Sequence, residues 1–119
     1  MAMIAVYESD DLMCGLLCEW LSGAGHIVRD SVGTHDRQMP RADLVIVSIA
    51  GPKREIDQRI RGVRTMHPRA PIVALSSQAR LGLSCNRGLA RELAVACVMA
   101  KPLTRKVLVA AVDDILAGV

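Results

Sequence analysis

The stretch "DLVIVSIAGP", residues 43–52, decides the fold of this 119-residue chain. An acidic residue precedes an apolar run that Ser48 alone interrupts, and a Gly-Pro turn ends it. Such a run favours a strand buried on both faces, as strands of parallel sheets are. Residues 71–77, "PIVALSS", repeat the pattern and also end in hydroxyls. We therefore expect a parallel sheet in which two inner strands end in serine.

The segments around this stretch alternate between strand and helix patterns. Short apolar runs predict further strands at 3–7, 26–30 and 95–100. Apolar residues at three- and four-residue spacing predict helices; on the first, Met13, Leu16, Leu17, Trp20 and Leu21 form the expected inner stripe. The order predicts a doubly wound α/β sheet. The helices are expected at 11–24, 53–67, 86–94 and 104–117, and a loop or single turn at 33–42.

Length and composition set the class of protein. A chain of 119 residues and 12.8 kDa fits a single domain over residues 1–119. Hydrophobic residues make up 51% of the chain, but no apolar run approaches the ~20 residues of a membrane span. The first residues lack the basic region and cleavage site of a secretion signal. We expect a soluble, cytoplasmic protein that makes no membrane contact.

The cysteines and histidines carry no metal-site pattern. Their spacing includes no CxxC pair, which argues against zinc and for reduced thiols. The chain also lacks a glycine-rich nucleotide motif, and it has one Trp, one Tyr and no Phe to line a cofactor pocket. We therefore expect no metal, no cofactor and no enzymatic activity.

Four polar segments follow the predicted strands, at 8–11, 48–52, 76–77 and 101–102. The carboxyl ends of parallel strands meet at one edge of the sheet, where such folds bind ligands. With these segments the chain resembles, over essentially its full length, the receiver domain of bacterial two-component response regulators. The resemblance implies a flavodoxin-like five-stranded sheet of order 2-1-3-4-5, with a second helix that is short or missing.

The resemblance also assigns positions of the family's phosphorylation site. It places Ser48 where receivers carry the phosphoacceptor aspartate and Val98 where they carry an aromatic residue. The magnesium-binding acidic pair of the family corresponds to Glu8 and Ser9, and Asp10 comes next. The family's hydroxyl residue corresponds to Ser76, and its lysine corresponds to Lys101. The pattern is thus that of a degenerate receiver.

The chemistry of these departures predicts a loss of phosphoryl transfer. Ser48 is a neutral hydroxyl with no histidine nearby in sequence to act as its base, so it is a poor nucleophile. Magnesium prefers several carboxylate oxygens, and the matching positions offer Glu8 and, less directly, Asp10. We expect a Glu8–Lys101 ion pair with Ser48 hydrogen-bonded nearby, and a domain held in one state.

A pseudo-receiver of this kind would signal by phosphorylation-independent protein–protein contact. The expected partner is a histidine kinase, another regulator, an output domain or a second copy of the chain. The predicted helices and strands are all used in the α/β sheet fold, which leaves no helix-turn-helix motif. This argues against direct nucleic-acid binding. Candidate interface residues lie on the last and first helices: Val107, Val109, Leu116, Cys14 and Cys18.

Two alternatives remain open at the level of sequence. The basic segment 53–69 could bind a nucleotide second messenger through Arg54, Arg61 and Arg64, which would make the chain a small-ligand sensor. Alternatively, the chain is an atypical receiver that is phosphorylated elsewhere, on Asp10 or Asp11.

Overall fold

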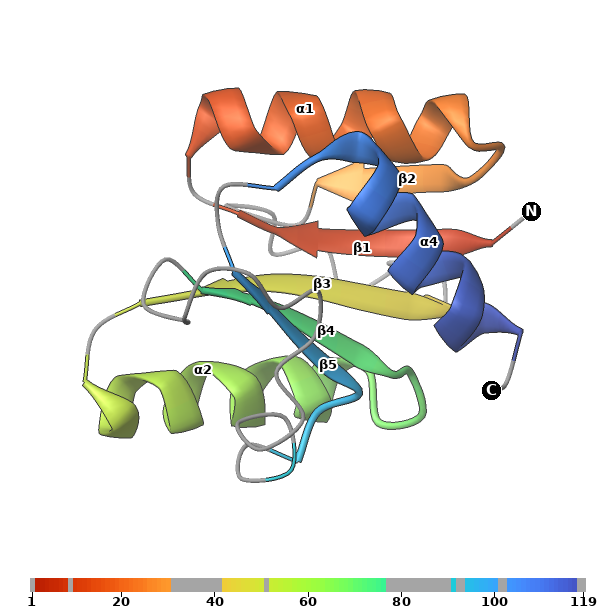
Figure 1. The fold of residues 1–119 in the computed structure, drawn as a ribbon. Coiled ribbons are helices and arrows are strands. Elements are labelled where there is room, and N and C mark those ends of the chain that lie inside the picture. Colours follow the sequence, from red (N-terminus) through yellow and green to blue (C-terminus); the bar gives the residue numbers. More distant parts are fainter. Residues whose placement is uncertain are drawn as a thin grey trace.

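The computed structural model describes residues 2–8, 10–30, 42–50, 52–76, 91, 94–100 and 103–117. Helices and strands alternate along most of this part of the chain (Figure 1). The strands are β1 (Met3–Tyr7), β2 (Ile27–Asp30), β3 (Leu44–Ile49), β4 (Ile72–Ser76) and β5 (Cys97–Ala100), and the helices are α1 (Asp11–Gly23), α2 (Lys53–Met66) and α4 (Arg105–Leu116).

The strands form one parallel sheet in the order β2-β1-β3-β4-β5. One row of the register runs from Tyr7 through Val47 and Ala74 to Val98. This arrangement confirms the predicted flavodoxin-like fold and its strand order. Because all strands are parallel, their carboxyl ends lie along one edge and their amino ends along the opposite edge.

The core consists of two apolar layers, one on each face of the sheet. α1 and α4 cover one face, where Leu17 and Leu108 pack in a cluster with Ile46. α2 covers the other face, where Ile60 packs in a cluster with Val47. Figure 1 shows α1 and α2 on opposite sides of the sheet. Strand β3 therefore contributes alternate residues to two cores, which is why its sequence is apolar almost throughout.

The phase of α1 differs from the expected one. Its buried residues are Cys14, Leu17 and Leu21, whereas Met13 and Trp20 of the predicted inner stripe are half-buried. The spacing 14-17-21 places the centre of the inner face one residue away from the predicted one. The expected stripe contains only larger apolar side chains, although a free cysteine is itself among the residue types most often buried.

The boundaries of α1 and α4 follow ordinary capping chemistry. The Asp10 carboxylate accepts the Leu12 N–H at 3.1 Å, and the Thr104 hydroxyl accepts the Val107 N–H at 3.3 Å. Beyond α1, Gly25 has a φ of 93°, which favours glycine. No helix in the described ranges is long and apolar enough to cross a bilayer. The predictions for 33–42, apart from Ala42, and for most of 86–94 lie outside the described residues.

Candidate functional site at the carboxyl ends of the strands

Glu8 is a buried carboxylate at the carboxyl end of β1. It immediately follows Tyr7, and its residue is 4% exposed. Its Oε1 accepts the backbone N–H of Asp10 at 3.0 Å. This hydrogen bond lets the carboxylate brace the turn that leads from β1 into α1. The structure therefore places the predicted acidic residue at the expected edge and gives it a structural contact there.

Asp10 lies at the same turn but performs a different task. Its side chain is the N-cap of α1, through the bond from Leu12, and the residue is exposed. Its backbone oxygen accepts the Cys14 N–H at 2.8 Å. Asp10 is thus oriented by the start of the helix.

Ser48 and Ser76 stand at the ends of the two central strands. Ser48 is half-buried and pairs in register with Leu75, while Ser76 is 2% exposed and pairs with Ile49. Side chains alternate along a strand, so Ser48 shares its face with Ile46 and Ser76 shares the opposite face with Ala74. The two hydroxyls therefore point to opposite faces of the sheet: Ser48 to the α1 side and Ser76 to the α2 side.

Val98 is fully buried in the α2-side layer, where it lies in register with Ala74. It occupies the position that the resemblance assigns to an aromatic side chain. Ser9 and Lys101 lie outside the described residues, so the predicted Glu8–Lys101 ion pair stays a prediction.

A second polar pair, which sequence reasoning missed, joins β1 to α2. The Tyr7 hydroxyl lies 2.7 Å from Nε2 of His67, and the two rings meet edge to face with centroids 5.8 Å apart. His67 follows the last residue of α2 and is 7% exposed. Burial lowers the pKa of His67, because desolvation disfavours the imidazolium. No local pattern relates two residues sixty positions apart, so the sequence carried no signal for this contact.

The arginines of α2 divide into anchored and outward-facing side chains. Arg64 donates through Nη2 to the backbone oxygen of Ala94 at 2.5 Å. Arg59, which was not singled out as an anion ligand, donates through Nη2 to the oxygen of Tyr7 at 3.3 Å. Arg54 and Arg61 are exposed. Of the three candidate anion ligands, Arg64 is thus already engaged by the backbone.

The candidate interface residues are mostly part of the core or packed against it. Cys14 is 8% exposed and belongs to the α1-side cluster, so its assignment to an outward patch is wrong. The corrected helix phase described above is the reason. Cys18, Val107 and Leu116 are half-buried and pack against the same cluster, whereas half-buried Val109 belongs to neither layer.

The comparisons with known proteins bear on the fold. No protein-family model matches the chain, and no curated protein matches its sequence. A response regulator receiver domain protein (CheY-like) from Methanospirillum hungatei superposes with a TM-score of 0.77 at 15% identity, covering 99% of this chain and 95% of that one. Vibrio cholerae chemotaxis protein CheY4 gives 0.74 at 17% identity, with 96% and 98% covered.

A third similar structure is a putative pilus assembly-related protein from Burkholderia pseudomallei. It superposes with a TM-score of 0.72 at 21% identity and covers 98% of this chain and 90% of that one. The likeness spans nearly all of each chain, whereas the identities are low. Taken with the strand order and the position of the strand ends, these superpositions show that the chain has the CheY-like fold of response regulator receiver domains.

Proposed function

We propose that residues 1–119 act as one receiver-like signalling domain that works by protein–protein contact without phosphorylation of Ser48. The observation that carries this proposal is the side chain at the end of β3, the position of the family's phosphoacceptor. A hydroxyl stands there, half-buried and next in the sheet to β1 and β4.

The chemistry of the surrounding residues supports a non-catalytic role. A serine hydroxyl needs a general base to attack phosphorus, and both described histidines already have polar partners: His67 contacts Tyr7, and His26 contacts Ala2 and Asp113. Magnesium would need several carboxylate oxygens, whereas Glu8 braces a turn and Asp10 caps a helix. In receivers an aromatic side chain at this position rotates inward on phosphorylation. Val98 has no aromatic ring, so this conformational change cannot occur at that position.

Phosphorylation is tested with acetyl phosphate and magnesium, followed by intact mass measurement. We expect no gain of a phosphoryl group on the wild-type chain. The matched variant Ser48→Asp restores a carboxylate at the same position and reports whether the rest of the site still supports transfer. A phosphoryl gain on the wild type that Ser48→Ala preserves would favour the atypical receiver, and Asp10→Asn and Asp11→Asn would then locate the acceptor.

The mode of contact is tested on α4. Val109 is the candidate interface residue that packs in neither core layer, so substituting it leaves the core intact. Light scattering of the wild type and of Val109→Lys reports homodimers, and a pull-down with both proteins as bait reports other partners. We expect Val109→Lys to lose a contact that Val109→Thr keeps. Equal behaviour of all three proteins would remove α4 from the proposal.

The nucleotide-sensor alternative predicts a different result. Arg54 and Arg61 are exposed and seven residues apart, which places them on one face of α2. Calorimetry against cyclic dinucleotides would show heat that Arg54→Gln and Arg61→Gln reduce. The adaptor proposal predicts no heat for any of these proteins.

A further inference from the structure

A cavity of about 560 Å³, widely open to solvent, lies at the end of the sheet opposite the candidate site. It is lined by residues from five separate parts of the chain: Ala2, His26, Asp43, Pro71, Asp113, Ile115 and Leu116. Ala2, Asp43 and Pro71 directly precede strands β1, β3 and β4, so the cavity lies at the amino ends of the strands. Its volume falls within the range of small-molecule sites.

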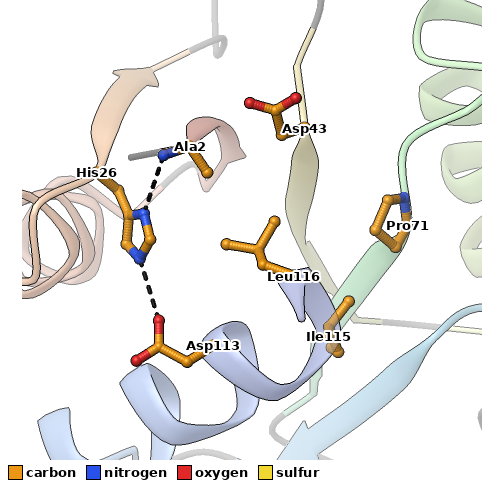
Figure 2. A pocket seen from close by; sticks show the side chains of 7 residues that line it. All are labelled: Ala2, His26, Asp43, Pro71, Asp113, Ile115 and Leu116. Atoms are coloured by element: carbon orange, nitrogen blue, oxygen red, sulfur yellow. Dashed lines mark hydrogen bonds and ion pairs between the residues drawn. The ribbon is translucent and has the colours of Figure 1, made fainter. Parts of the chain in front are cut away.

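One wall is built around the half-buried residue His26. The His26 side chain is 9% exposed, and its Nδ1 accepts the backbone N–H of Ala2 at 3.3 Å. Because Nδ1 is the acceptor, the neutral ring carries its proton on Nε2, which faces Oδ1 of Asp113 at 3.2 Å. Figure 2 shows this chain of contacts along one side of the cavity. The imidazole thereby holds one oxygen of the Asp113 carboxylate, whose side chain is 57% exposed at the mouth of the cavity.

A second carboxylate is fixed independently on another wall. Oδ2 of Asp43 accepts the backbone N–H of Met3 at 2.9 Å, and the Asp43 N–H donates to the Met3 oxygen at 2.7 Å. Each aspartate is thus held by one carboxylate oxygen, and the described partners leave its other oxygen available to a ligand. Orienting groups of this kind reduce the entropy that a ligand must lose to bind.

The rest of the lining is apolar. Pro71, Ile115 and Leu116 supply hydrocarbon surface, and Figure 2 places Leu116 between the His26–Asp113 pair and Pro71. The described side chains include no metal-binding group of three or more His, Cys, Asp or Glu residues. Two oriented carboxylates beside a hydrocarbon wall match a positively charged nitrogen on an aliphatic stem better than a bare metal ion.

We propose that this cavity binds a small aliphatic amine, with Asp43 and Asp113 as the carboxylates that receive its ammonium groups. The two acidic side chains of the lining favour this class of ligand locally, although the whole chain has a formal charge of +3. An amine would lay its stem along Leu116 and Pro71. The site is separate from the phosphoacceptor position and does not depend on the function proposed for it.

The test is calorimetric titration of the full chain with straight-chain diamines of increasing length. The matching diols, which keep the stem and lose the charge, are the ligand control. Asp43→Asn and Asp113→Asn keep an oxygen to accept the bonds from Met3 and His26 while removing one charge each. Asp114→Asn, an exposed neighbour on α4 that does not line the cavity, is the matched variant control. Thermal melts confirm that each variant is folded.

We expect one diamine length to bind best, because the optimum reports the spacing of the two carboxylates. Asp43→Asn and Asp113→Asn should each weaken it about tenfold, the loss typical of one charge-assisted hydrogen bond. Asp114→Asn should change the affinity by less than about twofold. Equal losses in all three variants, or diols that bind as well as diamines, would overturn the proposal. Binding of a lysine peptide through the same aspartates, without binding of any diamine, would also overturn it.

Discussion

The two ends of the sheet use their polar residues in different ways. At the carboxyl ends, Ser48 and Ser76 finish strands and Glu8 braces a turn. At the amino ends, Asp43 and Asp113 line a cavity, and their carboxylates contact a backbone N–H and the imidazole of His26 respectively. The fold family places its chemistry at the first end, but in this chain the oriented charged groups face a cavity at the second. A shared fold thus says where a site can form, and the individual side chains decide which of these places carries charged groups beside a cavity.

Removing the carboxylate of Glu8 gives the largest expected change in stability. Glu8→Ala leaves the Asp10 N–H without its acceptor and opens space around a residue that is 4% exposed. We expect a loss of about 1–3 kcal/mol in the free energy of unfolding, measured by urea denaturation. Glu8→Gln keeps the acceptor oxygen and should recover most of that loss. If Glu8→Gln is as unstable as Glu8→Ala, the charge of Glu8 matters more than its hydrogen bond.

At the opposite end, the matching change is His26→Ala. It removes two contacts, to Ala2 and to Asp113, that join β1 and α4 through one side chain. We expect a loss of about 1–2 kcal/mol by the same measurement. Asp113→Ala removes the exposed partner alone and should have a smaller effect. Equal losses in the two variants would show that the bond to Ala2 contributes nothing.

Restoring a carboxylate at the end of β3 should sharpen the contrast between the ends. Ser48→Asp adds a negative charge at the edge where Glu8 is already buried, so like-charge repulsion should lower stability by about 1 kcal/mol. Magnesium should then raise the melting temperature of the variant and leave that of the wild type unchanged. A shift of several degrees in the wild type would contradict the proposed loss of the magnesium site.

The smallest expected effect concerns pH and His67. Burial lowers the pKa of His67 below 6.5, so the unfolded chain binds this proton at a higher pH than the folded chain does. The stability from the neutral ring is therefore fully present above about pH 6.5 and is lost as the pH falls through the folded value. Urea denaturation of the wild type and of His67→Gln, from about pH 7.5 downward, measures the difference. A wild type that is no more sensitive to acid than the variant would contradict this prediction.

Much of the fold could be predicted from the sequence because its signals are local. The apolar runs of β3 and β4 show burial on both faces, and the spacing on α4 gives an amphipathic helix. The phase of α1 was predicted wrongly because Cys14 is a small side chain among larger apolar ones. Helix phase there depends on which residues meet the sheet, and that information is not local.

The candidate site could be predicted in part, and the cavity could not. Glu8, Ser48 and Ser76 follow strands, so a parallel order is enough to bring them to one edge. The cavity residues come from five places, and His26 had no recognisable partner in sequence, since Asp113 is 87 positions away. The His26–Asp113 contact depends on how α4 is positioned against the sheet, which local sequence patterns do not specify.

The bond between His26 and Asp113 also constrains the order in which the chain assembles. Asp113 lies 87 residues after His26 in the sequence, so the histidine lacks this carboxylate until α4 has been synthesised. α4 also supplies Ile115 and Leu116 to the lining, so the amino-end cavity exists only once this helix lies against the sheet.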